Sequence, residues 1–247
     1  MKAIVLCAGP GTRMRPLTDT TPKCMLPVGG KPLLHHTLER LAEAGVTDVA
    51  INLHHLPQAI VHDIKRGYRF GLRVTYSYEQ ELLGTAGAIK RLEWWLDEEP
   101  FFVVYGDEYV RPWVFGELWK RHQDNADTMW SVGTIVAHPV DSTEGRNTLY
   151  LLGDYRIHTI FPKDFEGWDL GCTQPQRWAA SGVYVFDPTM VDQIPNTAPC
   201  DLEGQALPMM MGSGVHLYAY SVTGDATIDI GTPHGYARAC QLAGPSW

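Results

Sequence analysis

The 247-residue sequence has little that would place it in a membrane or in a disulfide-stabilised secreted class. It contains no run of about 18 consecutive apolar residues, the length at which a helix can span a membrane. Its five cysteines are odd in number and widely spaced, without a C-x-x-C pair or a cysteine–histidine zinc pattern. We therefore expect a cytoplasmic protein with reduced thiols that have no chemical role. The five are Cys7, Cys24, Cys172, Cys200 and Cys240.

An excess of positive charge is also absent. The chain has 28 acidic and 20 basic residues, for a net charge of -8. Such a chain is not expected to bind nucleic acid or an acidic membrane surface. The net negative charge does not exclude a small anionic substrate, because a local cluster of cations can hold one. Hydrophobic residues at 45% and charged residues at 19% are typical of a folded globular protein.

Two common phosphate-binding motifs are missing. The P-loop pattern G-x-x-x-x-G-K-[ST] does not occur. The pattern G-x-G-x-x-G of dinucleotide-binding proteins fails at its third glycine, where Met14 stands. This disfavours a nicotinamide-dependent oxidoreductase.

What the sequence does have is a glycine-rich turn with cations close to it. Gly9 and Gly11 come directly after the apolar residues 3–7. Glycines let the backbone turn sharply, so that its N–H groups can face an anion. Arg13 can bind phosphate oxygens in a bidentate way, and Lys23 adds a point charge. The turn therefore predicts an anion site after the first strand.

Expected strands and helices alternate along the first half of the chain, and strands dominate much of the second. This order predicts an α/β fold with a doubly wound, mostly parallel Rossmann-like sheet and a smaller strand-rich acceptor lobe. We expect a single domain over residues 1–247, divided near residue 110. Strands are expected over residues 3–7, 49–53, 72–78, 101–105, 129–137, 179–186 and 215–221. Helices are expected over residues 32–44, 57–66, 85–96, 113–125, 203–211 and 233–242.

The glycine-rich segment resembles the signature of a known enzyme family. Residues 6–18 read LCAGPGTRMRPLT, and residues 21–33 read TPKCMLPVGGKPL. They resemble the pattern L-A-A-G-x-G-T-R-L-x-P-L-T…P-K-x-L-L-P-V-x-x-K-P of the sugar-1-phosphate nucleotidylyltransferases, in particular the hexose- and heptose-1-phosphate guanylyl- and uridylyltransferases. The departures are Cys7 for alanine and Cys24-Met25 for proline-leucine. Similarity resumes over residues 79–88, 106–107 and 229–233, so it covers nearly the whole chain.

The resemblance implies that residues 1–110 bind a nucleotide and residues 111–247 a sugar phosphate. Residues 79–88 carry amide and backbone groups that can read a base edge, and the family positions matching Gln80 and Gly84 lie against the base. Another interpretation is that Thr85 caps the following helix, a role that nucleotide binding would not exclude. The implied nucleotide-binding residues are Leu6, Ala8, Gly9, Gly11, Thr12, Gln80, Gly84 and Thr85. Arg13 and Lys23 are the implied catalytic cations.

Two aspartates are candidate metal ligands. Asp107 follows the apolar residues 101–105, and a carboxylate there is costly unless a cation pairs with it. Asp229 matches the second metal aspartate of the family, although residues 226–228 lack the tryptophan that usually precedes it. Two such oxygen ligands, completed by water and phosphate, suit Mg²⁺. Asp107 is therefore expected to be both catalytic and metal-binding.

The acceptor half departs more from the family pattern. Lys163 survives, but Pro162 stands where the family has glutamate, and residues 180–182 read Ala-Ser-Gly for Asn-Ala-Gly. Two groups that would bind sugar hydroxyls in the family are thus replaced. The expected substrate-binding residues are Lys163, Gly182 and Glu203.

The resemblance implies transfer of a nucleoside monophosphate from a nucleoside triphosphate to a sugar 1-phosphate, with release of pyrophosphate. The loop at residues 83–87 favours GTP over UTP or CTP. A non-catalytic relative that senses a nucleotide or sugar nucleotide is an alternative, although such a protein should have lost one of the four charged residues. A transferase acting on choline phosphate is a second alternative. A homo-oligomer is compatible with the sequence.

Overall fold

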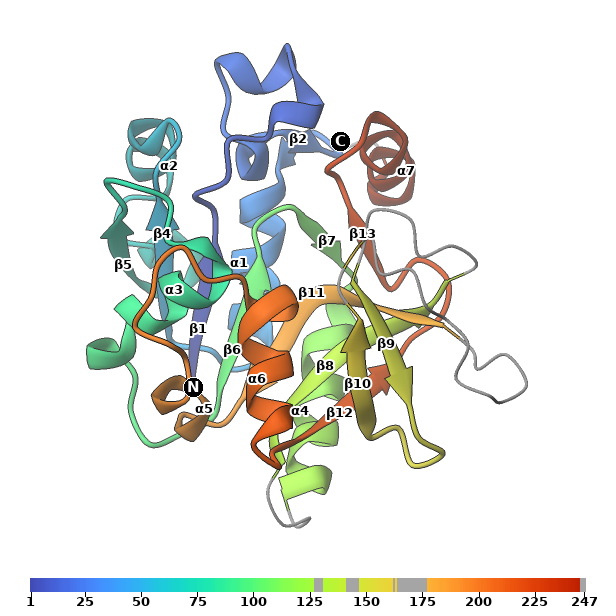
Figure 1. Ribbon diagram of the computed structural model, residues 1–247. Coiled ribbons are helices and arrows are strands. Elements are labelled where there is room, and N and C mark those ends of the chain that lie inside the picture. Colours follow the sequence, from blue (N-terminus) through green and yellow to red (C-terminus); the bar gives the residue numbers. More distant parts are fainter. Residues whose placement is uncertain (127–130, 141–146, 162, 164–176, 245–247) are drawn as a thin grey trace.

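The computed structural model describes residues 1–126, 131–140, 147–161, 163 and 177–244 (Figure 1). A nine-stranded sheet forms its centre, in the order β10-β9-β11-β6-β1-β4-β5, and β8 pairs with both β11 and β12. These strands are β1 (Lys2–Leu6), β4 (Asp48–Leu53), β5 (Arg73–Tyr78), β6 (Phe101–Tyr105), β8 (Ser131–Pro139), β9 (Thr148–Leu151), β10 (Ile157–Phe161), β11 (Trp178–Phe186) and β12 (His216–Ser221). The expected α/β sheet is confirmed.

The first half of the chain forms the parallel part of the sheet. β1 lies between β4 and β6 and is parallel to both, and β5 extends the sheet beyond β4. The inner residues of β1 are fully buried, which explains its unbroken apolar run. Three helices connect these strands: α1 (Leu33–Glu43), α2 (Pro57–Ile64) and α3 (Gly84–Arg91).

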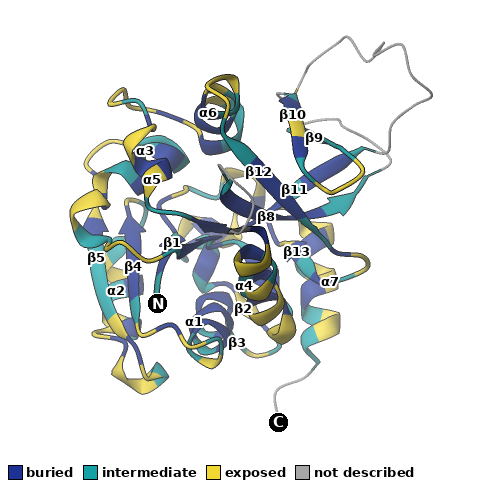
Figure 2. Ribbon diagram, turned by 90° about the horizontal axis from the view of Figure 1, so that it is seen from below, coloured by how far each residue is buried: buried dark blue, intermediate teal, exposed yellow. Residues whose placement is uncertain are grey.

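The second half joins the same sheet mainly through antiparallel strands. β11 is antiparallel to β6, β8 and β9, whereas β12 is parallel to β8. The buried strands run between helices on both faces (Figure 2). The helices here are α4 (Pro112–Ala126), α5 (Thr189–Asp192), α6 (Leu207–Gly212) and α7 (Pro233–Ala243), with a π-helical turn, η6 (Leu202–Ala206), before α6. No helix formed by the described residues is long and apolar enough to cross a membrane.

Two small antiparallel ribbons and five short 3₁₀ turns lie outside the main sheet. The ribbon of β7 (Glu108–Val110) and β13 (Thr227–Asp229) pairs Asp229 with Glu108. Next to this ribbon, the Ile230 N–H donates a hydrogen bond of 2.9 Å to the Asp107 carbonyl. The second ribbon joins β2 (Pro27–Val28) to β3 (Lys31–Pro32). The 3₁₀ turns are η1 (Thr12–Met14), η2 (Leu17–Asp19), η3 (Lys23–Met25), η4 (Tyr68–Phe70) and η5 (Glu93–Trp95).

A buried histidine anchors the second ribbon to α1. His36 Nε2 lies 2.8 Å from the Val28 carbonyl oxygen. Burial lowers the pKa of His36 to about 4, although the bond to Val28 acts in the opposite direction. The folded protein therefore holds this imidazole neutral where the unfolded chain would bind a proton.

We expect acid to destabilise the fold through His36. Its pKa is depressed on folding, so its contribution is complete above the unfolded value of 6.5 and declines as pH falls toward 4. At about 1.4 kcal/mol per pKa unit, the loss should reach up to about 3 kcal/mol. Urea unfolding of wild type and H36Q at pH 7.5 and pH 4.5 measures it. If the free energy of unfolding falls equally in wild type and H36Q between the two pH values, His36 is not the cause and this assignment is contradicted.

Candidate active site

The first cavity lies where the parallel strands β1, β4 and β6 end, with a volume of about 260 Å³. Open α/β sheets bind their ligands at this edge. The predicted residues Leu6, Ala8 and Gly9 line the cavity on one side, and Gly84 and Thr85 on the other. The two loops that the sequence identified therefore face each other across one space.

The glycine turn has the geometry that an anion site needs. Space is open around Gly9, because a β-carbon built there would meet no atom within 4 Å. Gly11 has φ 63°, and its carbonyl accepts a hydrogen bond of 2.8 Å from the Thr18 hydroxyl. Thr12 begins η1 and is exposed. Gly11 and Thr12 shape the turn without lining the cavity.

A buried polar network, not anticipated from the sequence, joins the two loops. The Cys7 N–H donates to Asn52 Oδ1 at 2.6 Å, and Asn52 Nδ2 donates to Glu79 Oε1 at 2.8 Å. Glu79 Oε2 in turn accepts from the Leu83 N–H at 3.1 Å. The available signal was an asparagine within the apolar residues 49–53, one strand away from the glycine turn.

The second loop is held against a distant segment. Gly84 has φ 75°, and a β-carbon there would collide with the Cys200 backbone. Thr85 Oγ1 accepts from the Leu202 N–H at 2.7 Å and donates to Asp201 at 3.2 Å. The interpretation of Thr85 as the helix cap is wrong, since α3 begins at Gly84 and the Thr85 hydroxyl binds η6 instead.

Gln80 does not line the cavity in this structure. Gln80 is exposed and directly follows Glu79, which does line the cavity. The exposed Leu82 is a further lining residue of the same loop. The loop thus offers the cavity an apolar side chain and backbone groups, with Gln80 at its outer edge.

The four charged residues singled out from the sequence come together. Lys23 Nζ forms an ion pair with Asp107 and lies 3.6 Å from Asp229 Oδ1. Arg13 Nη2 lies 3.9 Å from Asp229 Oδ2. The Lys23 side chain is only 12% exposed, whereas that of Arg13 is 66% exposed. Lys23 is therefore fixed by its partners, and Arg13 is free to reach toward a ligand.

The two aspartates suit a hard divalent cation. Because Lys23 Nζ approaches both carboxylates, their oxygens converge on one region. Carboxylate oxygens are the ligands that Mg²⁺ prefers, with water and phosphate oxygens completing the shell. Among the described residues there is no group of three or more histidines, cysteines or acidic residues that could hold a metal ion. A cation here would need oxygens from a ligand.

The second cavity, of about 720 Å³, adjoins the first and shares Tyr105 and Asp107 with it. All three residues predicted to bind the acceptor line it: Lys163, Gly182 and Glu203. The Lys163 residue is exposed, and its backbone N–H donates to Asn147 Oδ1 at 2.9 Å. Pro162, where the sequence suggested a lost contact, lies outside the described residues.

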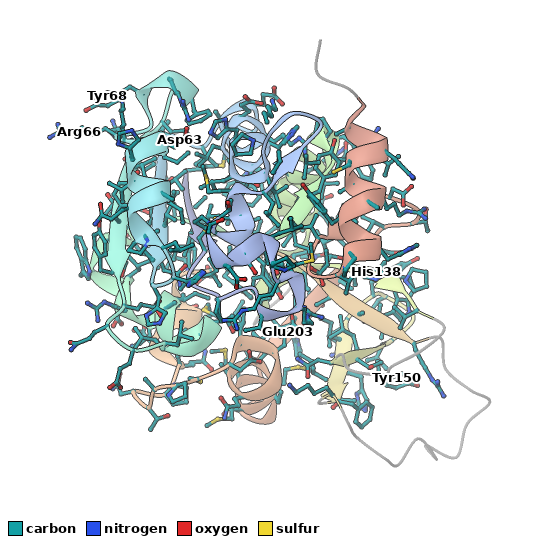
Figure 3. All side chains as sticks on the ribbon, turned by 90° about the horizontal axis from the view of Figure 1, so that it is seen from above. Asp63, Arg66, Tyr68, His138, Tyr150 and Glu203 are labelled. Atoms are coloured by element: carbon teal, nitrogen blue, oxygen red, sulfur yellow. The ribbon has the colours of Figure 1, made fainter. Side chains whose placement is uncertain are left out.

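Glu203 is fixed within this cavity by two donors. Its carboxylate accepts hydrogen bonds from the Tyr184 hydroxyl and from Asn147 Nδ2. Burial raises the pKa of Glu203, and these two hydrogen bonds partly offset the effect. In Figure 3, Glu203 and His138 lie on the half of the molecule opposite Asp63, Arg66 and Tyr68. A fixed carboxylate in a cavity is suited to binding hydroxyl groups.

Two further polar residues of this cavity were missed. Ser181 Oγ, in place of the family's Asn-Ala-Gly, lies 2.9 Å from His138 Nδ1. Glu108 is buried and lines the cavity. Burial raises the pKa of Glu108 well above its usual range, and Asp229 and Asp107 raise it further. Only its place after Asp107 could have drawn attention to it.

Comparison with known proteins agrees with this arrangement. The family profile described as nucleotidyl transferase matches residues 2–243. The chain belongs to the nucleotidyl transferase family.

One relative within this family is mannose-1-phosphate guanyltransferase 2 of Candida glabrata, 32% identical over 249 residues that cover 98% of this chain and 64% of the relative. This nucleotidyl transferase chain thus spans just under two thirds of that protein's length. Two solved structures share the fold. HddC of Yersinia pseudotuberculosis complexed with GMP-PN has a TM-score of 0.74 and 23% identity, covering 98% of each chain. UDP-glucose pyrophosphorylase complexed with UDP-glucose has a TM-score of 0.78 and 22% identity, covering 98% of this chain and 97% of the other.

Gly231 is expected to be essential for the charged centre. A β-carbon there would lie 2.6 Å from both Asp229 Oδ1 and Lys23 Nζ, and 2.7 Å from Arg13 Nη2. We predict that G231A lowers turnover roughly 10²-fold, the scale for displacing one electrostatic stabiliser. The matched control is G116A in α4, where a β-carbon meets nothing within 4 Å. G116A should keep wild-type turnover and unfold at or above the wild-type temperature, and near-normal turnover of G231A would argue against this arrangement.

Proposed function

We propose that this nucleotidyl transferase joins the nucleoside monophosphate of GTP to a sugar 1-phosphate and releases pyrophosphate. The observation that carries the proposal is the convergence of Arg13, Lys23, Asp107 and Asp229 where two cavities meet. One cavity has a glycine turn suited to phosphates, and the other has polar groups suited to a sugar. The relatedness to mannose-1-phosphate guanyltransferases supports GTP and makes mannose 1-phosphate the first acceptor to test.

The reaction needs no side chain as a nucleophile. A phosphate oxygen of the sugar 1-phosphate attacks the α-phosphorus, a new P–O bond forms, and the bond to the β-phosphate oxygen breaks. The acceptor phosphate is already an anion, so no base has to remove a proton. Catalysis then consists of positioning and charge neutralisation.

Each charged residue has a distinct part in this scheme. Arg13 has an exposed side chain and would stabilise charge on the transferring phosphoryl group. Lys23 would orient the two aspartates and contact phosphate oxygens. Asp107 and Asp229 would hold a divalent cation, for which we propose Mg²⁺, and this cation would supply neutralisation of the phosphate charge.

The decisive experiment is a matrix of nucleotides against acceptors, scored by pyrophosphate release. We expect GTP with a hexose 1-phosphate to give the highest kcat/KM, with UTP and CTP behind it. If dTTP gives the highest value, the choice of base is wrong. If nucleotides bind but no pair turns over, the non-catalytic alternative is correct.

Choline phosphate belongs in this matrix because of the second cavity. Three carboxylates besides the metal candidates line it, from Glu108, Asp201 and Glu203, together with the ring of Tyr105. Carboxylates and aromatic faces both attract a quaternary ammonium group. A cationic acceptor is therefore the second candidate substrate class.

The metal proposal predicts a loss of turnover on neutralising either aspartate. D107N and D229N should each lose roughly 10²-fold or more in kcat, because the cation would lose an oxygen ligand of full charge. D124N, an exposed residue of α4, is the matched control and should retain wild-type kcat. Titration of each protein with Mg²⁺ and EDTA measures the effect. Wild-type magnesium dependence in D229N would overturn the assignment.

Glu108 is expected to act on the acceptor and not on the nucleotide. E108Q keeps the shape but weakens hydrogen bonding to an acceptor hydroxyl. The KM for the acceptor should rise roughly tenfold, the scale of one hydrogen bond to a charged group, while the KM for GTP stays nearly constant. E117Q, on the exposed face of α4, is the matched control. Equal increases in both KM values would mean that Glu108 supports the whole site.

A further inference from the structure

Two departures from the family signature meet in the fold. Cys7 stands where the signature has alanine, and Cys24 where it usually has proline. Cys7 follows β1 and Cys24 lies in η3, and both side chains are buried, at 6% and 2% exposure. Both line the first cavity, the proposed nucleotide site. Seventeen positions apart in the sequence, they reach the same wall of one cavity.

The two side chains are in contact. A β-carbon built on Gly106 would lie 2.6 Å from Cys7 Sγ and 3.4 Å from Cys24 Cβ, so both cysteines pack on the same glycine. Their side chains are also hydrogen-bonded: this bond raises the pKa of the Cys7 thiol well above its usual range, and burial is the next cause. The two cysteines therefore lie together at the edge of the sheet.

The other described cysteines have different surroundings. Cys200 Sγ lies 3.9 Å from the Asp201 carbonyl oxygen, and Cys240 Sγ lies 3.7 Å from that of Pro27. Neither contacts a second thiol among the residues that the structure describes. Cys172 lies outside them.

We propose that Cys7 and Cys24 form an oxidisable dithiol, and that a peroxide converts it into an intramolecular disulfide that disables the first cavity. One thiol loses its proton, and the resulting thiolate attacks the peroxide and takes up one oxygen as a sulfenic acid; the hydroxide that leaves takes up the proton and becomes the first water. The second thiol then displaces this oxygen as another water. Both S–H bonds are lost, one S–S bond forms, and hydrogen peroxide is reduced to two waters.

The position of the disulfide explains why it should inactivate. It would enclose residues 8–23, the whole glycine turn, in one covalent loop. It would also join the residue next to Lys23 to Cys7, whose N–H is held by Asn52 at 2.6 Å. The glycine turn and the Lys23 ammonium would then be constrained together. The effect on turnover rests on the proposed function, whereas formation of the disulfide does not.

Peptide mapping tests the modification itself. The full chain is treated with hydrogen peroxide, free thiols are blocked with N-ethylmaleimide, and trypsin digestion follows without reductant. We expect residues 3–13 to be recovered disulfide-linked to residues 24–40, and GTP to slow the appearance of this pair. Dithiothreitol should abolish the link. Failure to recover the linked pair overturns the proposal, whatever the substrate matrix shows.

Variants connect the disulfide to activity. Each is compared with its own reduced form: C7A and C24A should become insensitive to peroxide, while C240S should lose turnover in proportion to the linked fraction, as wild type does. Either cysteine variant suffices if the other does not fold. Equal inactivation of C7A overturns the proposed link to activity. If no substrate pair turns over in any protein, the proposed function fails, and the linked peptide alone decides the modification.

Discussion

The position of Lys23 between Asp107 and Asp229 is the constraint on which the rest of this structure depends. Two carboxylates close together repel each other unless a cation lies between them. Lys23 supplies that cation from a third segment, and its side chain is 12% exposed, so its charge is poorly screened by water. Gly231 is needed beside them, because any side chain there would occupy the space of these groups. The centre therefore fixes three distant segments relative to one another.

The sheet brings these segments to one edge. β1 and β6 are parallel neighbours, so the turn after Leu6 and Asp107 emerge at the same edge. The ribbon of β7 and β13 then brings Asp229 to this edge from the end of the chain. Arg13, Lys23 and Asp107 come from the first half of the chain and Asp229 from the second, so both halves are needed to form the complete centre. The Asn52–Glu79 network adds the connection to the second loop.

The sequence was informative where one local pattern has one physical explanation. An unbroken apolar run predicts a buried parallel strand, and the glycine turn with Arg13 and Lys23 predicts an anion site. The assignment of Asp229 to the same centre depended on the resemblance to the family signature. The sequence was uninformative where a side chain has several partners to choose from. Thr85 could cap its own helix or bind η6, and only the tertiary contact with Leu202 decides this. No pattern in the sequence marks Glu108 as buried, and only the fold shows that it packs on Gly182 in β11, where an added β-carbon would lie 3.0 Å from Glu108 Cγ. The cytoplasmic location and a homo-oligomer stay predictions.

The departures from the family signature are not scattered over the site. All four charged residues of the reaction centre are kept, and the replacements fall on the floor of the first cavity and on the wall of the second. Cys7 and Cys24 change what lines the first cavity, while Ser181 changes what lines the second. In the proposed scheme, transfer depends on the charged centre, whereas acceptor choice and sensitivity to oxidants depend on the residues that line the two cavities. The fold thus allows substrate preference and regulation to diverge while the phosphoryl-transfer centre stays the same.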